Sequence, residues 1–360
     1  MIQVHMNFAG GNITVVRQEG NTFYLENQLR DTTEDWFYWA FCVEGAEGQT
    51  LTFSMQRFRI GKFGPAVSHD YENWHWLNQK DGDTFTYTFK ENETKVYFAH
   101  DMLYRPERFF DFAKEKGIEL KELCKTKKGT SVPYFTLGDG EFSILMAARH
   151  HACESTGSYI LEGVLEELLA SPIENAKIFC VPMVDIDGVV EGDQGKSRAP
   201  YDHNRDYSDE PQIYPQSAAI IKYGRENGSH YVFDFHSPWH EDWENDTVFV
   251  VRKRIDRKPT FDLFSQLFEN EISDKTMPYT IQNDKPPMTT WNKEPARCFS
   301  YYLSKGDDCK IGFALETAYF GLPPCPVSQA KLLETGKAFG RAVRAFVYAT
   351  RHMNNRGEPC

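Results

Sequence analysis

The sequence predicts an α/β fold, in which a mixed sheet is flanked by helices and preceded by a small antiparallel β-sandwich. Two observations lead to this prediction. Short runs of alternating hydrophobicity, separated by Gly, Asn and Asp, fill residues 1–98. In residues 99–360 strands alternate with longer helical stretches, which is typical of a sheet covered by helices. We therefore expect two domains divided near residue 98, as is natural for a chain of 360 residues.

The composition excludes several classes of function. A formal net charge of −12 without a long basic block argues against nucleic acid as a partner. No apolar stretch is long enough to span a membrane, and residues 1–8 lack the basic and apolar regions of a secretory signal. We expect a cytoplasmic protein whose eight single cysteines are mostly reduced. The sequence does not indicate an oligomeric state.

The first domain is predicted from its alternating runs. These runs are residues 12–16, 36–41, 50–54, 84–89 and 95–99. Aromatic residues are dense here, namely Trp36, Phe37, Tyr38, Trp39, Trp74 and Trp76. We interpret them as the wide side chains of a small core, since such residues are mostly buried. The alternative is a face that binds sugar or peptide.

The second domain is predicted from apolar runs and helical spacing. We expect strands at 131–137, 142–148, 176–184, 231–235 and 311–315, and helices at 105–116, after residue 158, and at 328–352. The final helix carries one apolar stripe, which indicates core packing only.

The motif His151-x-x-Glu154 lies in the turn between the strand at 142–148 and the following helix. In α/β sheets this turn is where ligands bind, and imidazole and carboxylate are both zinc donors. A catalytic zinc takes three protein ligands, so one more is expected. A second copy, His69 and Glu72, follows no buried strand, and we interpret it as coincidence. Cys153 is interpreted as a packed side chain.

Polar residues also follow the other predicted strands. The strand at 176–184 leads to Asp185 and a Gly-rich polar loop, 192–205, whereas His236 and Glu316 end the strands at 231–235 and 311–315. Taken singly, His236 could be a hydrogen-bonded strand-end residue, Arg205 a surface ion pair and Glu316 a helix cap. Together, these strand-end residues favour one functional site.

This ordered set of motifs resembles the zinc metallocarboxypeptidases, specifically the cytosolic-carboxypeptidase-like branch with an N-terminal β-sandwich. The matching segments cover nearly the whole chain: 36–38, 96–99, 148–155, 181–188, 202–205, 234–237 and 315–316. The resemblance implies a zinc carboxypeptidase-like catalytic domain at 99–360 and one catalytic Zn²⁺.

The resemblance also implies roles for individual residues. His151, Glu154 and His236 would be the zinc ligands, and Asp202 would orient His151. Asn204 and Arg205 would hold the terminal carboxylate of the substrate, for which a guanidinium offers two parallel hydrogen bonds. Glu316 would be the general base that takes a proton from water and returns it to the leaving amine.

The sequence departs from the family at several positions. Relatives usually place an Arg that neutralises the oxyanion where this chain has Gly195, so Lys196 or Arg198 would substitute, with Arg198 slightly favoured. His203 and Asp185 stand where relatives usually have Leu and Asn. The tyrosine that closes over substrate in digestive relatives has Tyr301 and Tyr302 as its candidates.

We expect a zinc-dependent hydrolase that removes the C-terminal residue from a peptide or protein tail. One alternative is a zinc deacylase of N-acyl amino acids, which needs the same groups but is usually built without this β-sandwich. A catalytically silent binding module is another. Some relatives trim acidic tails, for which Lys196, Arg198 and the basic run 252–258 are candidates. That run could equally be a charged strand edge.

Overall fold

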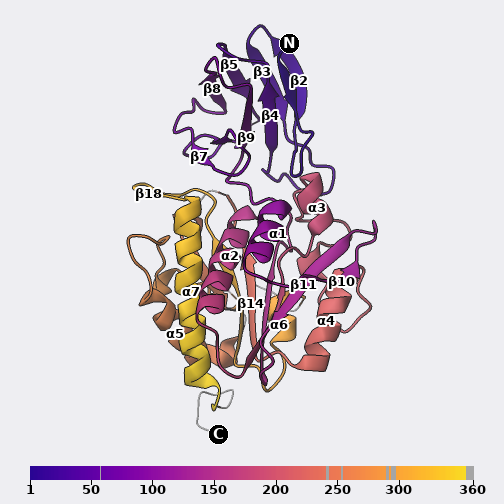
Figure 1. Ribbon diagram of the computed structural model, residues 1–360, viewed down its shortest axis with the longest axis vertical. Coiled ribbons are helices and arrows are strands. Elements are labelled where there is room, and N and C mark those ends of the chain that lie inside the picture. The colour runs from indigo at the N-terminus through magenta and orange to yellow at the C-terminus, as the bar shows by residue number, and fades with distance from the viewer. Residues whose placement is uncertain (57, 241–242, 253, 289–291, 293–296, 354–360) are drawn as a thin grey trace.

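The computed structural model describes residues 1–353 except 57, 241–242, 253, 289–291 and 293–296. Within these residues the N-terminal strands form a lobe that lies above a larger lobe of helices and strands in Figure 1. The arrangement confirms the predicted α/β fold with an N-terminal β-sandwich. The predicted division near residue 98 falls at the end of the last strand of the upper lobe, and we keep it as a proposal.

The N-terminal lobe contains two sheets. One has the order β1-β4-β9-β6-β7 and the other β2-β3-β5-β8. Their bounds are β1 Gln3–His5, β2 Thr14–Glu19, β3 Thr22–Glu26, β4 Ala40–Glu44, β5 Thr50–Ser54, β6 Ala66–Ser68, β7 His75–Trp76, β8 Thr84–Thr88 and β9 Lys95–Ala99. Neighbouring strands are antiparallel except β3 and β5, which run parallel. The rings of Trp39, Phe41, Phe53, Phe85 and Phe98 fill the space between the sheets.

The larger lobe is built on one sheet with the order β10-β11-β13-β12-β14-β16-β15. The bounds are β10 Lys121–Lys125, β11 Ser131–Leu137, β12 Phe142–Ala148, β13 Ala176–Val181, β14 Tyr231–His236, β15 Val248–Arg252 and β16 Ile311–Thr317. The central strands β13, β12, β14 and β16 are parallel, β11 and β15 flank them in the antiparallel direction, and β10 is antiparallel to β11. The central strands therefore place their carboxyl ends along one edge. A short pair, β17 Gly321–Leu322 and β18 Cys325–Pro326, follows.

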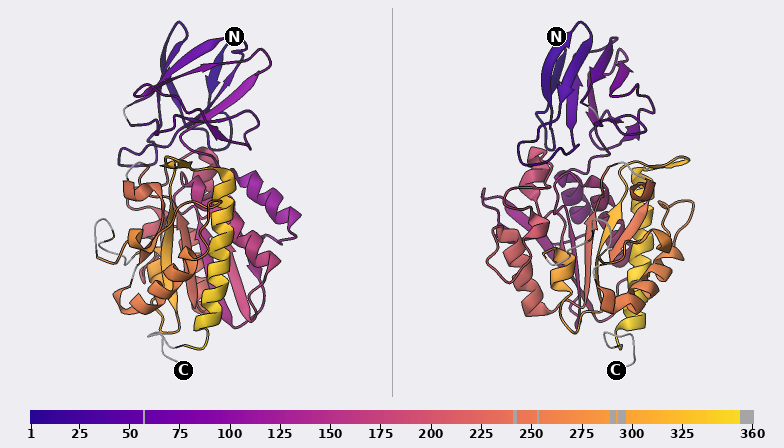
Figure 2. Two further views of the ribbon diagram at one scale, coloured as in Figure 1. Left: turned by 90° about the vertical axis from the view of Figure 1, so that its left-hand side faces the viewer. Right: turned by 180° about the vertical axis from the view of Figure 1, so that it is seen from behind.

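Helices pack around this sheet. They are α1 Pro106–Glu115, α2 Ser155–Ala170, α3 Ile186–Glu191, α4 Pro215–Asn227, α5 Lys258–Glu269, α6 Phe299–Leu303 and α7 Gln329–Thr350. Helices α2 and α7 lie side by side, as Figure 2 also shows. They approach closely because Gly163 and Gly336 face each other, and a Cβ at either position would lie 2.1–2.2 Å from the other helix's backbone. Helix α6 contacts β14 and β16.

Most predicted elements are confirmed, but the run 36–41 differs. Strand β4 begins only at Ala40, and residues 36–39 are not part of a strand. Their backbone is bonded by side chains instead: Asn27 donates to the carbonyls of Trp36 and Tyr38, and Gln194 bonds both the N–H and the carbonyl of Tyr38. The core interpretation of the aromatic residues holds for Phe37, Tyr38, Trp39, Trp74 and Trp76, which are buried. Trp36 is only half-buried.

Two further predictions concern the whole chain. Among the described residues, no helix combines the length and apolarity needed to cross a bilayer. The cysteines at 42, 124, 153, 180, 298, 309 and 325 are free thiols, whereas Cys360 lies outside the described residues.

Candidate active site

The candidate site lies at the carboxyl edge of the central strands. His151 and Glu154 occupy the turn between β12 and α2, and His236 is the last residue of β14. Glu316 is near the end of β16, and its Cα pairs in register with that of His236. The parallel alignment of these strands therefore gathers residues that are 165 positions apart in the sequence, counting from His151 to Glu316.

Three potential metal ligands converge here. His151 Nδ1 lies 2.9 Å from Glu154 Oε1, and His236 Nδ1 lies 2.7 Å from Glu154 Oε2. One donor atom from each residue falls within 4.8 Å of the others, and all three residues are buried. The two imidazoles thus turn the same ring nitrogen toward a shared carboxylate.

The other ring nitrogens face carboxylates. His151 Nε2 lies 3.5 Å from Asp202 Oδ1, and His236 Nε2 lies 2.7 Å from Asp234 Oδ2. Asp234 also contacts His150 Nδ1 at 2.8 Å. Sequence reasoning assigned Asp202 but gave no role to Asp234. The sequence does indicate a role for Asp234. Residues two apart on a strand point to the same side, and Asp234 precedes His236 by two.

Neighbouring charges favour the charged forms of Glu154 and His236. Burial raises the pKa of Glu154, but Lys196, His151 and His236 outweigh it and hold that pKa well below its ordinary value. Burial lowers the pKa of His236, but Asp234 and Glu154 raise it well above its ordinary value. A buried arrangement of this kind is strongly attractive to a divalent cation, which would replace the protons on the imidazoles.

The donor set fits zinc. Two imidazole nitrogens and one carboxylate are the three-ligand set of catalytic zinc sites, which leave a position for water. Zinc-binding histidines usually place their second ring nitrogen against a carboxylate, which fixes the ring. Asp202 and Asp234 stand in these positions. The residues present therefore match what a catalytic zinc requires.

The loop 192–198 approaches the turn very closely. Gly195 has a φ of 75°, and a Cβ there would lie 2.1 Å from Ala152 N. Only glycine fits both constraints, because a side chain would strain the backbone and collide with the residue next to His151. An Arg at this position is therefore sterically excluded in the observed conformation.

A cavity of about 340 Å³ adjoins the three converging residues and has two of them, His151 and Glu154, in its lining. It is lined by Trp36, His151, Glu154, Lys196, Ser197, Asp202, Arg205, Ser237, Pro238, Trp239, Asn245 and Glu316. Lys196 Nζ lies 2.6 Å from Glu154 Oε1 and 3.2 Å from the carbonyl of Ser237. Arg205 is exposed on this surface, and its Nη1 donates to the carbonyl of Asn204.

Arg198, which the sequence favoured slightly over Lys196, points elsewhere. Its guanidinium pairs with Asp31 at 3.0 Å, Asp185 at 2.8 Å and Asp193 at 2.9 Å. It also lies 3.3 Å from His203 Nδ1. Asp185 and His203, which depart from the family pattern, thus both contact Arg198, and all three residues line a second pocket. The structure brings Lys196 to the candidate site and not Arg198.

Three candidate substrate-binding residues do not line the cavity. The amide of Asn204 is buried, with Nδ2 3.1 Å from His236 Nε2 and Oδ1 accepting from Phe299 N. Tyr302 bonds Asp209 and Arg225 through its hydroxyl, and Tyr301 is its neighbour on α6. Neither tyrosine is among the residues that line the cavity.

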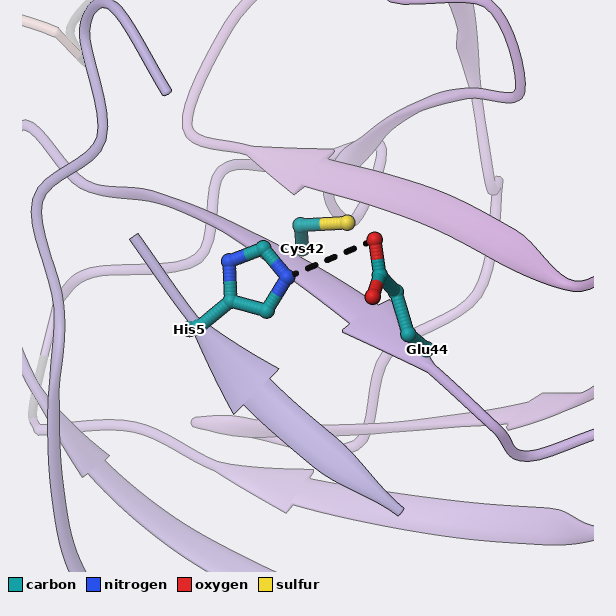
Figure 3. Close-up of side chains that lie close together, drawn as sticks. All are labelled: His5, Cys42 and Glu44. Atoms are coloured by element: carbon teal, nitrogen blue, oxygen red, sulfur yellow. Dashed lines mark ion pairs between the residues drawn. The ribbon is translucent and has the colours of Figure 1, made fainter. Parts of the chain in front are cut away.

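A second group of potential metal ligands, in the N-terminal lobe, is less suited to a metal. His5, Cys42 and Glu44 lie together on the first sheet of the N-terminal lobe (Figure 3). There, Lys95 already pairs with Glu44 at 2.8 Å, and burial raises the pKa of the Cys42 thiol to about 12, which disfavours the thiolate that metals bind.

The remaining candidate ligands from the sequence are occupied by other contacts. His69 contacts Glu93, whereas Glu72 pairs with Arg105 and Arg108, so the second His-x-x-Glu motif does not come together. Cys153 contacts the Tyr319 hydroxyl.

Comparison with known proteins identifies the family. Residues 4–100 match the family model described as the cytosolic carboxypeptidase N-terminal domain. An uncharacterized protein of Zymomonas mobilis is 30% identical over 258 residues, which cover 65% of this chain and 67% of that protein. Cytosolic carboxypeptidase 6 of Caenorhabditis elegans is 24% identical over 95% of this chain and 86% of its own. The chain belongs to the metallocarboxypeptidase family, in its cytosolic carboxypeptidase branch.

The fold of this metallocarboxypeptidase-family chain is shared by solved structures. A metallo-carboxypeptidase of Burkholderia cenocepacia superposes with a TM-score of 0.81 at 20% identity, covering 97% of this chain and 99% of that one. A Pseudomonas aeruginosa metallo-carboxypeptidase in complex with (2-guanidinoethylmercapto)succinic acid gives 0.78 at 18% identity, covering 96% and 99%. By contrast, the chain matches only 15% of the length of cytosolic carboxypeptidase 2 of Xenopus tropicalis.

Proposed function

We propose that this chain is a zinc-dependent carboxypeptidase that hydrolyses the C-terminal peptide bond of a peptide or protein tail. The observation that carries the proposal is the convergence of His151, Glu154 and His236, two of which, His151 and Glu154, line the same cavity as Glu316 and Arg205. Family membership supports it. The predicted cytoplasmic location stays a prediction that agrees with the name of the branch.

Each residue has a role set by its position. His151 Nδ1, the Glu154 carboxylate and His236 Nδ1 would hold the zinc, while Asp202 and Asp234 orient the imidazoles. A zinc ion in such a site acts as a Lewis acid and lowers the pKa of water. Glu316 takes the proton of the attacking water and delivers it to the leaving amine. Its register beside His236 and its place in the cavity lining support this role.

Lys196 provides the positive charge that relatives obtain from an arginine. Burial lowers the pKa of its ammonium, but Glu154 and other neighbouring acidic groups raise it above the ordinary value, so Lys196 stays charged at neutral pH. As negative charge develops on the carbonyl oxygen of the scissile bond, an ammonium already held in place stabilises it. Arg198 has no part in this step.

Arg205 binds the terminal carboxylate of the substrate. It is the exposed guanidinium of the cavity, and a planar guanidinium forms two parallel hydrogen bonds with a carboxylate. The ligand of the Pseudomonas aeruginosa protein is a substituted succinic acid, which carries the same chemical group. Asn204 would not contact the substrate and would instead help to position His236, which it contacts.

The test compares three substrate sets: peptides with a free C-terminus, the same peptides amidated, and N-acyl amino acids. We expect zinc-dependent release of a free amino acid from the first set and none from the amidated set. Amidated peptides cleaved at the same rate would contradict the role of Arg205. Turnover of N-acyl amino acids alone would instead identify a deacylase.

A further inference from the structure

Two tryptophans form one wall of the candidate cleft. Trp36 comes from the N-terminal lobe and Trp239 from the segment after β14, and their ring centroids lie 5.4 Å apart at 52°. The ring of Trp239 also packs edge-on against Phe37 at 5.3 Å. Trp239 is 46% exposed, although it is one of the largest apolar side chains. An exposed aromatic surface at the mouth of a cleft indicates a binding surface.

The position of Trp36 is fixed by contacts between the lobes. Its indole Nε1 donates to Ser197 Oγ at 3.2 Å, and Lys196 Nζ lies 4.6 Å from its ring centroid. Asp31 of the same segment accepts from the backbone of Gln194 and Gly195. The N-terminal lobe therefore both shapes the loop that carries Lys196 and contributes a side chain to the cleft.

Contacts among the lining residues give the cleft a direction. At one end, the backbone N–H of Arg205 donates to the carbonyl of Asp202, whose carboxylate faces His151. At the other end, Lys196 links Glu154 to the ring of Trp36. These contacts link Arg205 to His151 through Asp202, and Trp36 to Glu154 through Lys196. With the terminal carboxylate on Arg205 and the scissile carbonyl at the His–Glu group, the acyl side of a substrate would continue along the cleft to Trp36 and Trp239, which line the same cavity.

We propose that Trp36 and Trp239 bind the side chain of the penultimate residue, whose carbonyl is attacked, and that they select large apolar or aromatic residues there. This inference rests on the proposed carboxypeptidase function. Aromatic and apolar side chains gain from packing on an indole face, whereas a carboxylate is repelled by the negative face of the ring. The substrate class is therefore a peptide with an apolar penultimate residue rather than an acidic tail.

The ion pairs of basic residues outside the cleft agree with an apolar rather than an acidic substrate. Three of the basic residues considered for acidic tails pair with local carboxylates: Arg198 with three aspartates, Arg252 with Asp262 and Asp284, and Arg254 with Asp256. Lys253 of that run lies outside the described residues. Strand β15, which ends at Arg252, is an edge strand of the large sheet. These arginines do not line the cavity that contains Glu316.

The experiment measures kcat and KM for N-acetylated dipeptides with a constant C-terminal residue and Phe, Leu, Ala or Glu at the penultimate position. For the zinc-loaded wild type, we expect kcat/KM for Phe to exceed that for Ala by roughly 10-fold or more, mainly through KM, with Glu lowest. Trp239→Ala should reduce the Phe-to-Ala ratio to about 3-fold or less while kcat changes little. Trp36→Ala should do the same.

A matched control is Phe110→Ala, which removes a 38% exposed aromatic on α1 away from the cleft and should keep the wild-type ratio. Trp239 is exposed, so its variant tests the proposal even if Trp36→Ala does not fold. An unchanged ratio in Trp239→Ala, or equal turnover of Phe and Glu peptides, would overturn the inference alone. Failure to hydrolyse any peptide would overturn the proposed function as well.

Discussion

Lys196 Nζ lies 2.6 Å from Glu154 Oε1, so the loop 192–198 brings a buried ammonium directly to a proposed metal ligand. The close packing of Gly195 on the backbone of Ala152 makes this possible. The chain therefore has a cation one residue beyond the position where its relatives usually carry an arginine. The shift of the cation to position 196 and the glycine at position 195 are therefore linked, because Gly195 allows the close packing that brings Lys196 to Glu154.

Lys196→Met should lower kcat by about 10²–10³-fold with a smaller effect on KM, because it removes a preorganised charge at the carbonyl oxygen. Lys196→Arg should recover part of the loss. The comparison is Arg198→Met, which breaks ion pairs with Asp31, Asp185 and Asp193 and should mainly lower the melting temperature. The measurement is kcat and KM of the wild type and the three variants by steady-state kinetics at saturating zinc. A larger kcat loss in Arg198→Met than in Lys196→Met would reverse the assignment.

Glu316→Gln should lower kcat by about 10²–10⁴-fold, the usual contribution of a general base. Glutamine keeps the shape of the side chain but cannot accept the proton of water. Zinc content should stay at the wild-type level, because Glu316 is not among the converging ligands. Metal analysis alongside kinetics separates the two effects, and full turnover by this variant would exclude Glu316 as the base.

Much of the fold was predictable because the buried strands of the large sheet correspond to continuous apolar runs in the sequence. Strands β11 and β12 have the predicted bounds, and β14 and β16 extend one and two residues beyond them, through His236 and Thr317. Strand ends bearing His or Glu then indicated the site. The parallel pairing of β3 with β5 was not predictable, since alternation alone does not specify direction.

Other features depend on contacts that no local pattern encodes. The choice between Lys196 and Arg198 depends on the positive φ of Gly195 and on three distant aspartates. Trp36 sits in an alternating aromatic run that favours a core strand. Its place in the cleft follows from bonds between this segment and Gln194 and Ser197 of the other lobe.

Asp234→Asn and Asp202→Asn should each weaken zinc affinity by about 10–100-fold, because they remove the carboxylates that orient the two imidazoles. The buried Asp234 contacts both His150 and His236, so we expect its substitution to have the larger effect. Competition with a chelator measures the affinity. The exposed Asp111→Asn serves as the control, and equal affinity in all three variants would argue against these roles.

Asp101→Asn should stabilise the protein, and more so at pH 8 than at pH 5. Burial raises the pKa of Asp101 to about 7, with Arg149 opposing the shift, and neither carboxylate oxygen has a hydrogen-bond partner among the described residues. The folded state then binds more protons than the unfolded state between about pH 4 and pH 7, so this group lowers stability as the pH rises through that window.

The expected gain from Asp101→Asn at pH 8 is at most about 4 kcal/mol, from three pKa units at 1.36 kcal/mol each. Thermal melting of the wild type, Asp101→Asn and Asp111→Asn at both pH values tests it. A lower melting temperature for Asp101→Asn at pH 8 would show that Asp101 carries a stabilising charge.

Zinc titration of the metal-free protein, followed by calorimetry and elemental analysis, tests the central claim most directly. One equivalent should bind to the wild type, and His236→Ala should lose that binding because it removes one of three ligands. His69→Ala, which alters the histidine of the other His-x-x-Glu motif, should retain it. A wild type that binds no zinc, or a His236→Ala variant that binds it equally well, would contradict the proposed metal centre.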